Sequence, residues 1–105
     1  MTWKPIVAGV DDSPEGLRAA QAAVAVADKA RVPCYLCHAI RGWFDPNIPQ
    51  MPEAEEWRRL LIDSARTNVR QRLSGHIPQA TRDLLDVRFG PASMVLAQRA
   101  DEVDA

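Results

Sequence analysis

The sequence has few of the residues that build metal centres. Its 105 residues include two histidines, His38 and His76, and two cysteines, Cys34 and Cys37. Zinc sites need several such ligands clustered together, and His76 follows a predicted helix far from the other three. We therefore predict no metal site. No nucleophile paired with a base can be recognised either, so we expect no catalytic residues and no enzymatic activity.

The chain also lacks an excess of charge of one sign and a long hydrophobic run. Its 13 Lys and Arg residues nearly balance 14 Asp and Glu residues, so no basic field favours nucleic acid or an anionic membrane. No run approaches the roughly 18 apolar residues of a membrane span, and the first residues do not form a secretory signal. We expect a cytoplasmic protein with neither nucleic acid nor membrane as a partner.

The two cysteines belong to a Cys-x-x-Cys-His pattern at residues 34–38, which is typical of covalent haem attachment. This segment is nevertheless strongly apolar and is predicted to be a buried strand. At roughly 3.3 Å per residue, its cysteines would lie about 10 Å apart on opposite faces of the sheet. We therefore predict reduced, buried thiols, no disulfide and no haem. His38 is interpreted as a packing residue at the end of the strand, with contact to a ligand as the alternative.

Three apolar segments alternate with helical patterns and predict one α/β domain over residues 1–105. Such alternation is typical of a parallel, doubly wound sheet of the flavodoxin-like kind, with strand order 2-1-3 or 3-2-1. The length suits a single core, and no linker or repeat interrupts it. The predicted strands are residues 6–10, 34–40 and 84–89, and the predicted helices are residues 14–30, residues 53–74 and a segment that begins near residue 92.

The strands differ in their polarity. Residues 6–10 are apolar throughout, which predicts a central strand buried on both faces. In the third strand Asp86 and Arg88 alternate with apolar residues, which is typical of an edge strand with one wet face. The helix of residues 53–74 should bury Trp57, Leu61 and other apolar residues on one face and leave its arginines solvated.

Residues 41–52 contain glycine and prolines but no regular period, and they are predicted to form a loop. Several of their side chains are large and apolar, including Trp43, Phe44 and Ile48. The loop is either a lid or partner surface, or a cover over the end of the sheet.

In doubly wound sheets, ligands bind beyond the carboxyl ends of the strands, so we expect a site near Val10, Asp11 and Ile40. A carboxylate at a strand end can accept two hydroxyl donors. The alternative is that Asp11 and Asp12 only cap the turn. Either Ser13 or Asp12 can serve as the N-cap of the helix that follows.

Four segments together resemble the universal stress protein family. They are residues 5–13 (Pro-Ile-Val-Ala-Gly-Val-Asp-Asp-Ser), 15–20, 36–40 (Leu-Cys-His-Ala-Ile) and 87–92 (Val-Arg-Phe-Gly-Pro-Ala). The resemblance implies a stress-response regulatory protein with a pocket for ATP or another adenine nucleotide. It implies that Val10, Asp11, Ser13 and Ala39 form this pocket, with Asp11 near the ribose and the backbone of Ala39 against adenine.

The sequence departs from the family pattern at its carboxyl end. The family's phosphate-binding Gly-x-x-Gly segment has no counterpart, so the resemblance covers a domain truncated after the third β-α unit. Backbone amides of such loops bind phosphates, so we expect weak or absent ATP binding and no ATP cleavage. The first strand would keep an uncovered edge, which predicts a homodimer or a complementing chain. The alternative function is a protein-interaction module that binds no nucleotide and uses this edge and residues 43–51.

Overall fold

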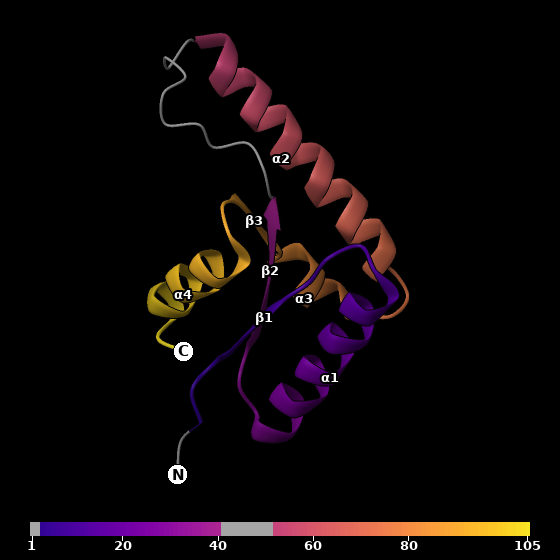
Figure 1. Cartoon of the computed structure of the whole chain (residues 1–105). Helices are drawn as coiled ribbons and strands as arrows, with labels where there is room; N and C mark the ends of the chain where they lie inside the picture. Colours follow the sequence, from indigo (N-terminus) through magenta and orange to yellow (C-terminus); the bar gives the residue numbers. More distant parts are fainter. Residues whose placement is uncertain (1–2, 41–51) are drawn as a thin grey trace.

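The computed structural model describes residues 3–40 and 52–105, with the side chains of residues 52–54 left out. The predicted lid or partner loop around Trp43, Phe44 and Ile48 lies outside these residues. Strands and helices alternate along the chain (Figure 1). The elements are β1 (Ile6–Gly9), α1 (Pro14–Ala30), β2 (Cys34–Ile40), α2 (Pro52–Leu73), α3 (Gln79–Asp83), β3 (Asp86–Phe89) and α4 (Ala92–Val103).

The three strands form one parallel sheet in the order β1-β2-β3. Helices cover both faces, with α4 on one side and α1, α2 and α3 on the other (Figure 1). This confirms the predicted doubly wound α/β fold and selects the 3-2-1 order. In the described sheet β1 lies at an edge and pairs only with β2, as expected for a first strand that keeps an uncovered edge, whereas its apolar composition alone is typical of a central strand. None of the described helices is long and apolar enough to span a membrane.

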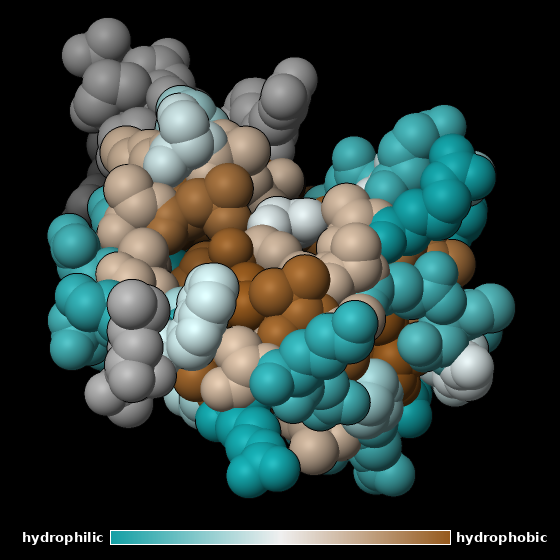
Figure 2. All heavy atoms as spheres, turned by 90° about the horizontal axis from the view of Figure 1, so that it is seen from below, coloured by the Kyte–Doolittle hydropathy of each residue, from teal (hydrophilic) through white to brown (hydrophobic). Residues whose placement is uncertain are grey.

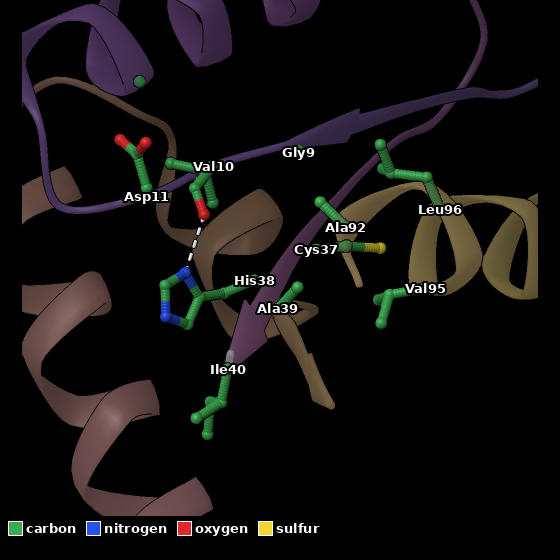
Figure 3. Close-up of a pocket in the computed structure, with 11 residues that line it drawn as sticks. Gly9, Val10, Asp11, Cys37, His38, Ala39, Ile40, Ala92, Val95 and Leu96 are labelled. Carbon is green, nitrogen blue, oxygen red and sulfur yellow. Dashed lines mark hydrogen bonds between the residues drawn. The ribbon is translucent and has the colours of Figure 1, made fainter. Parts of the chain in front are cut away.

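The core lies between the sheet and helices α1 and α2. Leu36 of β2 and Leu73 of α2 are almost completely buried at its centre. β2 alternates as expected: Cys34 belongs to this core, and Cys37 points to the other face, toward α4 (Figure 3). Cys34 and Cys37 are both buried and free, as predicted. Not all hydrophobic side chains are covered: some remain visible in the middle of the face of the molecule shown in Figure 2.

Helix α1 begins at a serine cap. The Ser13 hydroxyl oxygen accepts the Gly16 N–H at 3.0 Å, and Pro14 occupies the first helical position, where its missing N–H costs nothing. Of the two predicted caps, the structure uses Ser13. The helix ends at Arg31, whose left-handed backbone (φ 56°) lets its N–H reach the Ala27 and Asp28 carbonyls.

Helix α2 follows the prediction only in its second half. Val69 and Leu73 are buried, whereas Trp57 and Leu61 are 61% and 38% exposed. The first half of α2 extends past the sheet (Figure 1), so its apolar residues have no strand beneath them. The periodicity of the sequence could not show where the sheet ends.

The short helix α3 was not predicted. It has only five residues, and its N-cap, Pro78, makes no side-chain capping bond. Its end is held by a tertiary contact, because the Arg70 guanidinium donates to the carbonyls of Arg82 and Asp83 at 3.2 and 2.9 Å. Arg70 was predicted to be solvated, and this part of the prediction is wrong.

The polar side of β3 is partly covered by α4. Arg88 donates to Asp86 at 2.7 Å and also binds Glu102 of α4, and Arg99 of α4 lies 3.5 Å from Asp86. These bonds raise the pKa of Arg88, chiefly through Glu102, and Arg88 in turn lowers the pKa of Glu102. The predicted edge position of β3 is confirmed, but its charges form an ion-pair network with α4.

Candidate functional site

A cavity of about 640 Å³ lies where the carboxyl ends of β1 and β2 meet the first turns of α1 and α4. This volume is typical of pockets for small organic ligands. Figure 3 shows Asp11 and His38 on one side of the strand ends, and Cys37, Val95 and Leu96 on the other. The cavity therefore has a polar side and an apolar side.

Asp11 supplies the carboxylate of the polar side. Its Oδ1 accepts the backbone N–H of Ser13 at 2.9 Å and also the Ser13 hydroxyl. These two hydrogen bonds lower the pKa of Asp11, with a smaller contribution from His38. Among the described residues no hydrogen bond reaches Oδ2. Asp11 is therefore ionised at neutral pH, held in one orientation by Ser13, and has an oxygen left for a ligand.

Gly16 makes room for this carboxylate. A Cβ atom built on Gly16 would lie 2.1 Å from Asp11 Oδ1 and 3.0 Å from the Asp11 backbone nitrogen. Real Cβ atoms do not approach so closely, so any larger residue would displace the Asp11 side chain. Gly16 was predicted to lie in the helix but not to belong to the site.

The backbone of Ala39 faces the cavity because β2 continues beyond β1. Gly9 is the last residue of β1 in register with β2, opposite Cys37, and the Cys37 carbonyl accepts the Val10 N–H at 2.8 Å. Backbone groups of alternate residues face the same neighbour. Ala39, two residues after Cys37, therefore directs its N–H and C=O toward the space that β1 has left.

His38 forms a hydrogen bond with the last backbone carbonyl before Asp11. Its Nδ1 lies 2.8 Å from the Val10 carbonyl oxygen, and because a carbonyl only accepts, the ring must donate. This bond holds the Val10 carbonyl, which would otherwise continue the ladder toward Ala39. His38 lines the cavity, and the alternative given for it, contact with a ligand, stays a prediction.

The apolar side is formed by the first turns of α4. The Val10 side chain packs into the core on the other face of the sheet and is only 5% exposed. Leu96 lies over β1, where a Cβ atom on Gly9 would be 3.5 Å from its Cδ1. Burial raises the pKa of the Cys37 thiol to about 11, so Cys37 contributes a neutral wall. Apolar walls of this kind suit an aromatic ring.

The structure brings three of the four predicted site residues to the cavity. Val10, Asp11 and Ala39 line the cavity, and Ser13 acts on it through Asp11. The wall from α4 was not predicted, because no local sequence pattern determines how that helix crosses the sheet. In the part of the chain that the structure describes, no three His, Cys, Asp or Glu side chains gather as metal ligands.

Comparisons with known proteins agree with this architecture. The model of the universal stress protein family matches residues 2–105. A solved structure, a universal stress protein in complex with cAMP, is similar over 100% of this chain and 69% of its own, with a TM-score of 0.53 and 20% identity. At this identity the likeness establishes the fold alone. A search of curated protein sequences found no match.

Proposed function

The chain belongs to the universal stress protein family, and from this premise we propose that it is a stress-response regulatory protein that binds an adenine nucleotide without converting it. The observation that carries the proposal is the cavity at the strand ends, where Asp11 Oδ2 and the backbone of Ala39 have no hydrogen-bond partner among the described residues across this space. A nucleoside-binding pocket requires a carboxylate for the ribose, a backbone donor and acceptor for the base, and apolar walls.

We assign the adenine ring to the space between the end of β1 and Leu96. Adenine presents neighbouring donor and acceptor groups on one edge, and the N–H and C=O of Ala39 match such an edge. The bond from His38 to Val10 supports this assignment, since it keeps the Val10 carbonyl from competing for the Ala39 N–H.

We assign the ribose to Asp11. A ribose hydroxyl can donate to Asp11 Oδ2 while Oδ1 stays bonded to Ser13. Hydrogen bonds to a carboxylate contribute about 1.5–3 kcal/mol. Ser13 then acts as a positioning residue, and it does not have to touch the ligand.

The phosphates should add little to the affinity for this chain. Its five glycines do not form a Gly-x-x-Gly motif, and loops with that pattern supply the backbone amides that bind phosphates. We expect adenosine, AMP and cAMP to bind about as well as ATP. Among these ligands, cAMP is the one bound in the similar solved structure.

Calorimetric titration with these four ligands, and with guanosine as a specificity control, tests the proposal. Asp11→Asn should weaken binding of every adenine ligand by about tenfold or more, because the charge is lost while the shape is kept. Asp28→Asn removes the same charge from an exposed position in α1 and should leave binding unchanged. Equal affinities of the Asp11→Asn and unaltered proteins would remove Asp11 from the pocket.

A protein-interaction module is the second candidate function. It is favoured by the free edge of β1 in the described sheet. The same titration separates the two: if the folded chain binds none of the adenine ligands, the nucleotide proposal fails and the interaction function leads.

A further inference from the structure

A second cavity lies beside the turn that joins β1 to α1. Its volume is about 380 Å³, and it is lined by Asp12 of the turn and by Asn68, Gln71 and Arg72 of α2. Figure 1 shows this turn passing close to the carboxyl-terminal half of α2. The cavity at the strand ends is lined by Asp11, the neighbouring residue of the turn, and shares none of these four residues.

The buried residues of α2 determine which side of the helix faces the second cavity. Val69 and Leu73 lie in the core, and residues three and four positions apart lie on one face of a helix. Asn68, Gln71 and Arg72 have this spacing and form a polar face next to the buried one. Because a rotation of α2 would expose Val69 and Leu73, the polar face is held toward the turn.

Asp12 takes no part in capping α1. Ser13 provides the cap and also bonds to Asp11, so the turn is fixed on both sides of Asp12. Among the described residues, no hydrogen bond or ion pair reaches the Asp12 carboxylate, and the residue is exposed. Asp12 therefore offers its carboxylate to the cavity.

Asp12 and Arg72 carry opposite charges and line one cavity, yet they do not pair with each other. In the part of the chain that the structure describes, none of the four lining side chains has a hydrogen-bond or ion-pair partner. No apolar residue lines this cavity, so it offers no wall for an aromatic ring. The ligand that fits it is small and polar, with a positive group for Asp12 and a negative group for Arg72.

We propose that this cavity binds a free amino acid with a short polar side chain. Asp12 binds the ammonium group, and Arg72 binds the carboxylate, which a guanidinium can hold through two parallel hydrogen bonds. The amides of Asn68 and Gln71 can both donate to and accept from the side chain of the ligand. This site is independent of the proposed nucleotide site, because it uses none of the residues assigned to adenine and ribose.

An NMR titration of the unaltered protein with L-glutamine tests the site. The side-chain amide signals of Asn68 and Gln71 and the backbone amide of Asp12 should shift with one common dissociation constant of about 1–10 mM, since contacts exposed to solvent are weak. The amides of Gly9 and Ala39, at the other cavity, should not move. The absence of any shift at about 50 mM glutamine would overturn the proposal.

Two analogues of glutamine test the two charges separately. N-acetyl-L-glutamine lacks the ammonium group and L-glutamine amide lacks the carboxylate, so each should bind about threefold to fivefold more weakly than glutamine. In Asp12→Asn, glutamine and its N-acetyl analogue should bind about equally well, and in Arg72→Gln so should glutamine and its amide. A variant that still distinguishes its pair of ligands as the unaltered protein does would contradict the assigned contact.

Matched variants separate this site from general effects of charge and from the nucleotide site. Asp28→Asn and Arg59→Gln remove the same charges from exposed positions of α1 and α2 and should leave glutamine binding unchanged. Asp12→Asn should weaken glutamine binding without affecting adenosine, and Asp11→Asn should do the reverse, so the two proposals can fail separately. If Arg59→Gln weakened glutamine binding as much as Arg72→Gln, the proposed site would be overturned.

Discussion

The imidazole Nδ1 of His38 lies 2.8 Å from the carbonyl oxygen of Val10. The two residues are 28 positions apart in the chain, and the bond joins the ends of β1 and β2 at the cavity. It holds the Val10 carbonyl at the point where β1 turns toward Asp11. The ring therefore bonds to the carbonyl group that directly precedes Asp11 and that would otherwise face the Ala39 N–H.

Replacing His38 should weaken ligand binding. In His38→Ala the Val10 carbonyl loses its donor, which costs about 1 kcal/mol, and it becomes free to bond to the Ala39 N–H. We expect adenosine affinity to fall about fivefold to tenfold, measured by calorimetry. His38→Asn, which keeps a donor near the same place, should recover part of the loss. Equal binding by His38→Ala and the unaltered protein would mean that the ring only packs.

Substitution at Gly16 should affect the site more than the fold. Gly16→Ala would bring a Cβ atom to 2.1 Å from Asp11 Oδ1, so the carboxylate must move, although alanine is the better helix former by about 1 kcal/mol. We expect adenosine binding to weaken about tenfold with little change in the midpoint of thermal unfolding. The control Ala22→Gly, at an exposed position of α1, should lower stability and leave binding intact. Unimpaired binding by Gly16→Ala would contradict the role of Asp11.

Removing the Ser13 hydroxyl should change both stability and the titration of Asp11. Loss of this N-cap costs about 1 kcal/mol, measured by urea unfolding. Because Ser13 lowers the Asp11 pKa below 3.8, Ser13→Ala should raise it, as followed by NMR. A lowered folded-state pKa stabilises the protein above pH 3.8, and this contribution is lost as the pH falls further. An unchanged Asp11 titration in Ser13→Ala would contradict the observed bonds.

The ion-pair network of β3 and α4 should make stability depend on Arg88. Arg88→Met keeps most of the apolar stem but leaves Asp86, whose side chain is 19% exposed, without its closest cation. We expect unfolding to become easier by about 1–3 kcal/mol. Arg18→Met, which removes an exposed pair in α1, is the matched control and should have a much smaller effect.

The same network predicts a pH dependence with a definite sign. Arg88 holds the Glu102 pKa below 4.5, so its bond to Glu102 stabilises the folded state above pH 4.5, and this stabilisation is lost as the pH falls below that value. Urea unfolding of the unaltered protein should therefore lose more stability between about pH 5 and pH 3 than Arg88→Met does. If the free energies of unfolding of the two proteins changed with pH in the same way, the bond between Arg88 and Glu102 would be contradicted.

The sequence predicted the bounds of the strands and helices well. It predicted less well which of them lie side by side in the fold. Apolar runs and helix signals locate β1, α1 and β2 to within a residue or so, because these signals are local. Whether β1 lies inside the sheet or at its edge is decided by distant segments, so its apolar composition, which is typical of a central strand, does not by itself determine its place in the described sheet. The same reason explains Trp57, whose periodicity predicts burial although no strand lies beneath it.

The site residues that lie next to one another in the sequence were predictable. The contacts between distant segments of the chain were not. Asp11 stands directly after a buried strand, so a general rule for parallel sheets locates it. The Leu96 wall and the bond from His38 to Val10 depend on how α4 and β2 lie across β1, which no local pattern encodes. Gly16 could have been recognised only after the orientation of the Asp11 side chain was known.

The two cysteines should be chemically inert in the folded protein. Burial raises the pKa of Cys37 to about 11 and also raises that of Cys34, so at pH 8 only about one Cys37 thiol in a thousand is ionised. We expect a thiol-reactive dye to label the native protein slowly and both cysteines quickly in urea, and haem to remain unattached after incubation under reducing conditions. Rapid labelling of native protein at pH 8 would show that β2 opens easily, which its place at the centre of the described sheet argues against.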